Sequence, residues 1–427
     1  MKLDSKIKND SLESDCHVRN ARAKSSKSKR MNTRFLQNID HYLGPIACFA
    51  GRLFKKYFPC LESGEGQFVK RILIIKFWGI GSITQLCPSL RYLRDQHPKA
   101  EIHFLTLTPQ AAIVECIEEV NVIHSLSIGN SIARFLVSIL PLMKRLRDLH
   151  FDTVYDFEFF ANFSALCCAA VGVRSIGFKS LRAWRNAIYD VTPSLDVSLH
   201  IRQQFLKLAS AREGQLPASA YSELIPFTIS GEVKKSTAAL LAKAGINGPF
   251  IAVNPNAGDL FLGRRWPAAR FSRLSRQLAE ETNLPIVLIG SREEREYVLQ
   301  VKEEARHMSV FSLAGQMSLI ELIALLSKAH LYVGNDSGPL HLAVAQGTKT
   351  VSLFGPESCN VYGPCSARHE VITLNLWCSP CINVYNSKRM ACHDNACIKG
   401  ISVDCVHERC LKLLDGCGTG QVAKEKE

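Results

Sequence analysis

Short, continuously apolar segments alternate with amphipathic segments along the first half of the chain. Residues 71–77, 101–107 and 153–157 have the composition of buried strands. Apolar residues at three- and four-residue spacing between them predict helices. Strands that alternate with helices of this length indicate βαβ units and a parallel sheet. The sequence therefore predicts an α/β fold for this half.

A second alternating series begins at Pro249, after a less regular stretch over 175–245 with prolines at 193, 217 and 226. We place the domain boundary between residues 215 and 245. We expect two doubly wound, Rossmann-like domains that face a cleft, over 70–230 and 231–415. The strands predicted in the second domain are 250–254, 285–290, 310–313, 331–334 and 350–354.

The chain of 427 residues is long enough for two domains and has an ordinary hydrophobic content of 47%. Its net charge of +13 is unevenly placed, because residues 1–34 hold ten basic and four acidic residues. This Ser-rich stretch has little apolar periodicity, so we expect residues 1–34 to be a disordered basic tail and residues 416–427 a short second tail. A basic tail suits an anionic surface, either phospholipid or nucleic acid.

Residues 35–69 join this tail to the first domain. Their apolar part, 42–54, is interrupted by Arg52 and is shorter than the roughly 20 residues that span a bilayer. Lys55 and Lys56 at its far end favour an amphipathic helix at the surface of an anionic membrane. A helix that simply packs on the first domain is the alternative.

The sixteen cysteines do not indicate a secreted protein, because no apolar signal segment follows the basic start. Most lie singly in apolar runs, which indicates a reducing, cytosolic compartment. Four others lie in a Cys-rich insertion over 377–400. Their CxxC and two further cysteines are compatible with a structural zinc site, with disulfides or with thiols. These residues are Cys378, Cys381, Cys392 and Cys397.

Polar residues follow the buried strand at 331–334. Asp336 and Ser337 precede a helix whose first turn contains Pro339, and Gly347 ends that helix. A helix N-terminus at the carboxyl end of a strand presents N–H groups and a positive dipole end to a phosphate. A well-capped helix without a ligand is the alternative for this segment alone.

Two other strand ends in the same domain are followed by polar residues that can bind phosphate or ribose. The Asn254-Pro-Asn-Ala-Gly258 loop is followed by Arg264 and Arg265, whose guanidinium groups can donate to phosphate oxygens. Residues 290–294 (GSREE) offer carboxylates for ribose hydroxyls. Three strand ends of one domain are thus suited to a nucleotide diphosphate.

These segments resemble the second half of the family-9 glycosyltransferases, the lipopolysaccharide heptosyltransferase family. The DSGPLHLA (336–343) and FGP (354–356) segments are the most specific, and the resemblance covers about 70–412. It implies the GT-B architecture, with a nucleotide-diphosphate sugar, typically ADP-heptose, on the second domain and a glycolipid acceptor on the first. The donor-binding residues that follow are Asn256, Arg264 (at the family's phosphate-binding Lys), Arg265, Glu294 (ribose), Asp336, Ser337, Gly338 and His341.

The resemblance also exposes a departure. The family's opening turn usually ends in Gly-Asp, whose Asp is taken as the catalytic base, but this chain has Ser82 there. A serine hydroxyl is too weak a base near neutral pH unless another group activates it. Asp156 and Glu158, at alternate positions after a strand of the same domain, are the preferred bases, with a helix-capping role as the alternative. His200 is a further candidate.

The resemblance thus implies an inverting glycosyltransferase that acts in lipopolysaccharide-core synthesis, and we expect it at the inner face of the plasma membrane. We expect no cofactor to be required, because helix termini and cations can stabilise the leaving diphosphate. Ser82 motivates the alternative of a non-catalytic sugar-nucleotide-binding relative. A nucleic-acid partner is not expected, because residues 1–34 contain no aromatic residue to stack on bases.

Overall fold

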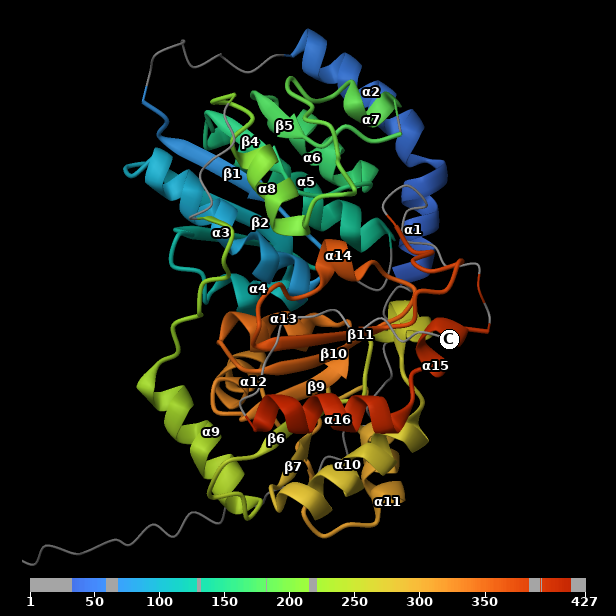
Figure 1. The fold of residues 1–427 in the computed structure, drawn as a ribbon. Helices are drawn as coiled ribbons and strands as arrows, with labels where there is room; N and C mark the ends of the chain where they lie inside the picture. The colour runs from blue at the N-terminus through green and yellow to red at the C-terminus, as the bar shows by residue number, and fades with distance from the viewer. Residues whose placement is uncertain are drawn as a thin grey trace, which may run out of the picture.

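The computed structural model describes residues 33–58, 68–128, 132–181, 183–214, 221–383, 392 and 394–415. The two predicted tails, at 1–34 and 416–427, lie outside these residues except for positions 33 and 34. The described residues form two α/β domains, each built on one parallel sheet (Figure 1). This is the predicted fold class.

The first domain has a five-stranded parallel sheet in the order β3-β2-β1-β4-β5. Four of its strands are almost wholly buried, as expected where helices cover both faces of a parallel sheet, whereas the edge strand β3 is partly exposed. The strands are β1 (Arg71–Ile75), β2 (Glu101–Leu107), β3 (Val122–Leu126), β4 (Thr153–Asp156) and β5 (Ser175–Gly177). The helices are α3 (Ile80–Gln96), α4 (Thr108–Val114), α5 (Ile132–Asp148), α6 (Asn162–Val171), α7 (Ala183–Asn186) and α8 (Ile201–Ala209).

The second domain has a six-stranded parallel sheet in the order β11-β10-β9-β6-β7-β8. All five predicted strands are present, and β11 is an addition. The strands are β6 (Ile251–Asn254), β7 (Ile286–Leu288), β8 (Val310–Ser312), β9 (Leu331–Asn335), β10 (Thr350–Phe354) and β11 (His369–Thr373). The helices are α9 (Gly231–Lys243), α10 (Ala268–Thr282), α11 (Arg295–Ala305), α12 (Leu319–Leu326), α13 (Gly338–Ala345), α14 (Cys359–Tyr362), α15 (Ala396–Lys399) and α16 (Val403–Leu414), with a 3-10 turn, η2 (Asp259–Arg264).

The two domains pack directly on each other through α3 and α13 (Figure 1). One cluster of buried apolar residues runs through both, from Leu90 of α3 to Leu340 of α13. Because α3 follows β1 and α13 follows β9, the carboxyl ends of both strands point to this junction. That is where ligands bind in doubly wound folds.

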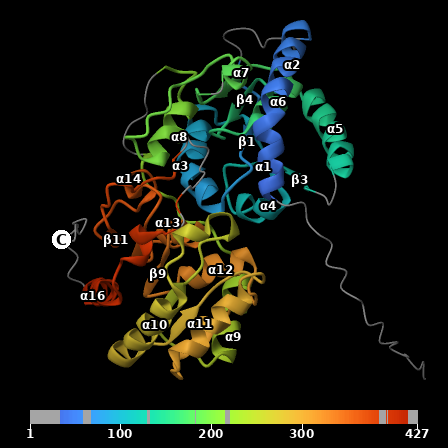
Figure 2. The ribbon, with the colours of Figure 1, turned by 90° about the vertical axis from the view of Figure 1, so that its right-hand side faces the viewer.

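Two further helices, α1 (Thr33–Tyr42) and α2 (Gly44–Tyr57), cover one side of the first domain (Figure 2). Here α2 packs against α6 and α7. Within the described residues, no helix is both long enough and apolar enough to span a bilayer. The predicted interfacial segment over 35–69 therefore contains a pair of surface helices, and its positions 59–67 lie outside the described residues.

Candidate active site

The N-terminus of α13 lies at the carboxyl end of β9. Pro339 occupies the first turn of α13, as predicted, and Ser337 is the N-cap residue. The Ser337 hydroxyl accepts a hydrogen bond from Asn254 Nδ2 at 3.1 Å instead of capping its own helix. Pro339 has no N–H, and the Leu340 N–H donates to the Ser337 carbonyl at 3.2 Å. This leaves the Gly338 N–H and the positive dipole end of α13 to suit a phosphate.

Asn335 joins the end of β9 to the segment between β6 and α10. Its Oδ1 accepts from the Trp266 N–H at 3.0 Å, and its Nδ2 donates to the carbonyls of Pro255 and Asn256, both at 3.1 Å. Asn335 is fully buried at the end of β9. The sequence analysis missed it, although its place directly before Asp336 at a strand end was the available signal.

Arg264 lies beside two carboxylates. Its Nη1 is 2.7 Å from Asp336 Oδ2 and 3.9 Å from Glu357 Oε2. Burial disfavours the charged guanidinium, but the two carboxylates outweigh it and raise the pKa of Arg264. Glu357, which the sequence analysis also missed, is buried after the FGP segment. The predicted cation and the predicted Asp336 therefore meet beside the N-terminus of α13.

The other predicted donor residues lie at neighbouring strand ends. Arg265 turns away from Arg264 and places its guanidinium 4.2 Å from the centroid of the Tyr297 ring on α11. Glu294 is part-exposed and accepts from the Ser291 N–H at 2.9 Å, which shapes the loop after β7. Asn256 is buried, and its Nδ2 donates to Asn254 Oδ1 and to the Ile289 carbonyl. Asn256 therefore links two loops in this arrangement.

His341 connects the second domain to the first. Its Nδ1 lies 2.9 Å from Gln85 Nε2 on α3, and its Nε2 lies 3.8 Å from Asp336 Oδ1. An amide nitrogen only donates, so Nδ1 accepts and Nε2 holds the ring proton on the side of Asp336. The ring also lies against Gly81, where an added Cβ would come within 2.3 Å of His341 Cδ2. The glycine is therefore required for this contact.

Ser82 lies in the first turn of α3, directly after Gly81, and is part-exposed. The preceding Gly79 has a φ of 84°, a backbone conformation that favours glycine. The glycine turn thus brings Ser82 next to the residue that His341 contacts. The position where the family has its Asp lies at the domain junction.

Glu158 is buried and holds the loop between β1 and α3. Its Oε1 accepts from the N–H groups of Phe77 and Trp78 at 2.7 and 3.1 Å, and its Oε2 is 3.1 Å from Lys76 Nζ. Lys76 is buried as well. This arrangement orients the loop that leads to Ser82, and Glu158 does not present its carboxylate to solvent.

Asp156 is completely buried, with 0% of its side chain exposed. Its Oδ2 lies 3.2 Å from Arg185 Nη2 and accepts from the Tyr189 hydroxyl at 2.5 Å, while its Oδ1 accepts from the Glu158 N–H at 2.9 Å. Burial raises the pKa of Asp156, against the opposing effect of Arg185. The interpretation of Asp156 and Glu158 as acceptor-facing bases is therefore corrected to a structural role, because both are enclosed by protein partners.

His200 uses both ring nitrogens. Its Nδ1 accepts from the Arg202 N–H at the start of α8, and its Nε2 lies 3.1 Å from the Gly363 carbonyl of the second domain. Burial lowers the pKa of His200 to about 4. His200 therefore joins the two domains and offers no open nitrogen to take an acceptor proton.

The C-terminal cysteines do not form the predicted zinc site within the residues that the structure describes. No group of three or more His, Cys, Asp or Glu side chains has a metal-binding arrangement there, and no disulfide joins Cys378, Cys381, Cys392 or Cys397. Burial is the main factor that raises the pKa of Cys381 and of Cys397, which disfavours their thiolate forms. The neighbouring His393 lies outside the described residues.

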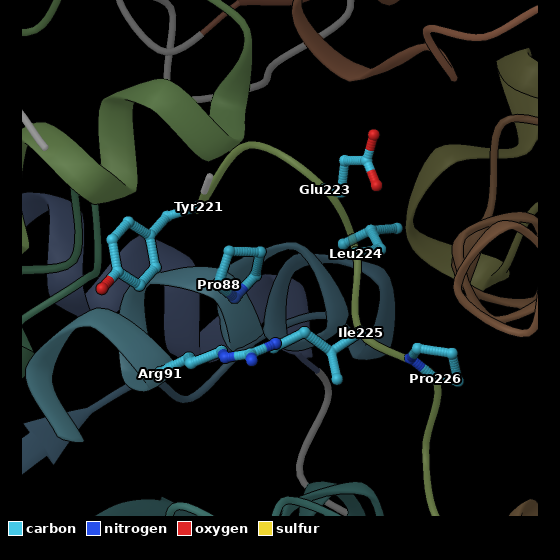
Figure 3. Close-up of a pocket in the computed structure, with 7 residues that line it drawn as sticks. All are labelled: Pro88, Arg91, Tyr221, Glu223, Leu224, Ile225 and Pro226. Atoms are coloured by element: carbon cyan, nitrogen blue, oxygen red, sulfur yellow. The ribbon is translucent and has the colours of Figure 1, made fainter. Parts of the chain in front are cut away.

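A small cavity lies between α3 and the segment that links the domains (Figure 3). Pro88 and Arg91 of α3 line it together with Tyr221 and residues 223–226. Pro88 is six residues beyond Ser82, or about 9 Å along a helix. The cavity is therefore separate from the candidate active site.

Two Rossmann-like domains that pack at the carboxyl ends of β1 and β9 have the architecture of the GT-B glycosyltransferases. A family model for glycosyltransferase family 9 (heptosyltransferase) matches residues 139–391, more than half of the chain. The chain belongs to this family.

Curated relatives agree with this assignment. The lipopolysaccharide heptosyltransferase 3 of Escherichia coli is 24% identical over 290 residues, which are 64% of this chain and 80% of that protein. The lipopolysaccharide core heptosyltransferase OpsX of Haemophilus influenzae is 22% identical, over 67% of this chain and 79% of its own. The lipopolysaccharide heptosyltransferase 2 of Escherichia coli K12 is 31% identical, over 30% of this chain and 36% of its own.

Solved structures share the fold. The ADP-heptose lipopolysaccharide heptosyltransferase II of Escherichia coli has a TM-score of 0.63 at 22% identity, covering 81% of this chain and 98% of its own. A family-9 glycosyltransferase from Veillonella parvula has a TM-score of 0.67 at 19% identity, covering 81% and 97%. These similarities place the two domains in the GT-B architecture.

Proposed function

We propose that this chain transfers heptose from ADP-heptose, with inversion, to a lipopolysaccharide-core or related glycolipid acceptor. The observation that carries the proposal is the Arg264–Asp336 pair beside the N-terminus of α13, at the junction of the two domains. A cation and a helix N-terminus in one place fit a diphosphate. The names of the relatives support the choice of sugar and acceptor.

In this proposal the second domain binds the donor. Arg264 and the first turn of α13 stabilise the charge that develops on the leaving diphosphate, so no metal or other cofactor is required. Glu294, part-exposed after β7, accepts hydrogen bonds from the ribose hydroxyls. Asp336 holds Arg264 in place through their 2.7 Å contact.

The first domain presents the acceptor. The acceptor hydroxyl attacks the anomeric carbon from the side opposite the diphosphate, so that one C–O bond forms as the other breaks and the configuration inverts. Ser82 stands where the hydroxyl must be oriented as it loses its proton. Since Asp156 and Glu158 are enclosed by partners, we propose that Ser82 positions the acceptor and that the released proton passes to solvent water at this part-exposed position.

A non-catalytic sugar-nucleotide-binding role is the second candidate. It is favoured by one observation, the serine at the position of the family's catalytic Asp. Donor binding is common to both candidates, so turnover separates them.

We further propose that the enzyme works in the cytoplasm, peripherally bound to the inner face of the plasma membrane. A glycolipid acceptor lies in that membrane, which is why an acceptor-binding domain at its surface fits the proposal. The domain boundary that we propose at 230/231 coincides with the start of α9 at Gly231.

Isothermal calorimetry with ADP-heptose tests donor binding. Arg264→Ala should weaken binding by at least about 1.5 kcal/mol, roughly tenfold, because a charge-assisted hydrogen bond to the diphosphate is lost. Arg276→Ala, which removes an exposed arginine from α10, is the matched control and should bind as the wild type does. Equal affinity of both variants would remove Arg264 from the site. GDP- and UDP-sugars, measured alongside, test the choice of nucleotide.

A further inference from the structure

The helix pair α1–α2 is attached to the first domain by polar and small residues. The Asp40 carboxylate accepts from the N–H groups of Asn162 and Phe163, at 3.0 and 2.7 Å, and so caps α6. Lys55 Nζ lies 2.5 Å from Asp190 Oδ2 and donates to the Ile188 carbonyl at 3.0 Å. The inner side of α2 is thus fixed to the protein at both ends of the pair.

Glycines bring α2 close to α6. An added Cβ at Gly44 would lie 2.5 Å from Asn162 Nδ2, and one at Gly51 would lie 3.1 Å from Leu166 Cδ2. Ion pairs, caps and glycines therefore hold the inner side, whereas an ordinary surface helix buries its apolar residues there. Cys48 is buried in the apolar core beside these contacts, whereas the large apolar residues of α2 are exposed.

The large apolar residues of α2 are exposed instead. Ile46 and Tyr57 are eleven residues apart, about three helical turns, and are 71% and 68% exposed. Trp184 of α7 extends the surface, because its ring makes an edge contact with Phe49 at 5.1 Å between centroids. We define the outer apolar face by Leu43, Ile46, Phe49, Leu53, Tyr57 and Trp184, all exposed.

The charges around the outer apolar face are positive. Residues 33–58 contain a single acidic residue, Asp40, and its carboxylate is bound to α6. Arg52 and Lys56 are exposed on α2. The sequence that leads into α1 adds ten basic and four acidic residues over positions 1–34.

We infer that the outer apolar face is the surface that seats the first domain on an anionic phospholipid membrane. Aromatic and aliphatic side chains would enter the boundary between headgroups and acyl chains, while Arg52 and Lys56 meet lipid phosphates. Figure 2 shows α1 and α2 together along one side of the first domain, so contact along them presents that domain to the membrane. The inference deepens the proposed function and rests on it for the glycolipid acceptor.

Co-sedimentation of the full chain with vesicles tests this surface. Wild-type protein should pellet with phosphatidylglycerol–phosphatidylcholine vesicles and less with phosphatidylcholine alone. The double variant Ile46→Ser/Tyr57→Ser should lose about tenfold or more in vesicle affinity, because two exposed apolar anchors are removed without a change of charge. Met308→Ser, at a 95% exposed apolar residue of the second domain, is the control and should bind as the wild type does.

Equal vesicle binding by the double variant and the wild type would overturn the inference. So would a change from dimer to monomer by ultracentrifugation with vesicle binding unaltered, because the face would then bind a second copy. ADP-heptose affinity, measured on the same proteins, separates the two proposals. Absence of donor binding in the wild type contradicts the proposed function and leaves the vesicle result standing.

Discussion

At the scale of single residues, the domain junction depends on Gly81 and its neighbour Ser82. The His341 ring occupies the space that any larger side chain at Gly81 would need. Ser82 is held next to this contact, within the first turn of α3. A carboxylate at this position would therefore face the donor site across the junction.

The pair Ser82→Asp and Ser82→Ala tests the role of this position. A carboxylate can take the acceptor proton, so Ser82→Asp should raise turnover by about 10²-fold or more, the usual effect of a positioned general base. Ser82→Ala should lower turnover by up to about tenfold, because a hydrogen bond of about 0.5–1.5 kcal/mol that positions the acceptor is lost. Initial rates with one donor–acceptor pair measure both. Unchanged turnover in Ser82→Asp would place proton removal elsewhere, and wild-type turnover in Ser82→Ala would show that the hydroxyl does not position the acceptor.

The sequence predicted part of the candidate site at this scale. Arg264, Asp336, Ser337, Gly338 and His341 could be predicted because they follow predicted strands in segments of recognisable family pattern. Asn335 was missed although it directly precedes Asp336 at a strand end. Gln85 and Glu357 could not be predicted, since their partners are distant in the chain: Gln85 meets His341 across 256 positions. The sequence could not show that Asp156 is enclosed by Arg185 and Tyr189, because these contacts join residues about thirty positions apart. Asp156 was therefore predicted as a base.

At the scale of elements, the end of β4 is held to α7 by a buried ion pair. Asp156 and Arg185 both have 0% of their side chains exposed, at 3.2 Å. The exposed pair Arg273–Asp404, which joins α10 to α16 at 3.0 Å, has the same chemistry with side chains 52% and 75% exposed. The two pairs allow a matched comparison.

Asp156→Asn should destabilise the protein by about 3–5 kcal/mol, because it leaves the Arg185 charge buried without its partner. Asp404→Asn should cost less than about 1 kcal/mol, as is usual for an exposed pair. Urea unfolding measures both. Equal effects would contradict the assigned role, and a large loss of turnover in Asp156→Asn at unchanged stability would restore Asp156 as the base.

Neighbouring strands β2 and β3 contain a pair of buried histidines. His103 Nδ1 lies 2.9 Å from His124 Nε2, and burial lowers the pKa of both, to about 4 for His124. A histidine ordinarily titrates near 6.5, so the unfolded chain binds protons that the folded chain does not as the pH falls from about 6.5 to about 4. The neutral pair therefore contributes its full stabilisation above about pH 6.5, and this contribution is lost as the pH falls toward about 4.

We therefore expect the unfolding free energy to fall between pH 7.5 and pH 5 by on the order of 1–2 kcal/mol for this pair. His124→Gln should reduce that fall, since one of the two titrating rings is removed. His330→Gln, at an exposed histidine, should leave it unchanged. Denaturant unfolding at several pH values measures the three proteins. An identical pH dependence in His124→Gln and the wild type would show that the pair is not responsible.

At the scale of the whole molecule, the alternation of strands and helices was sufficient to predict two Rossmann-like domains. It could not predict how they meet, because that depends on contacts between distant residues such as Gln85 with His341 and His200 with Gly363. Nor could it predict that α2 turns its apolar residues outward, since periodicity shows that an apolar face exists but not what covers it. These two features set the site and the proposed membrane surface.

Mass spectrometry of a core glycolipid acceptor after incubation with ADP-heptose tests the central claim most directly. The account predicts one added heptosyl residue, with the anomeric configuration opposite to that of the donor when the product linkage is examined by NMR. Arg264→Ala should form much less of this product. Donor binding without any transfer, or transfer with retained configuration, would contradict the account.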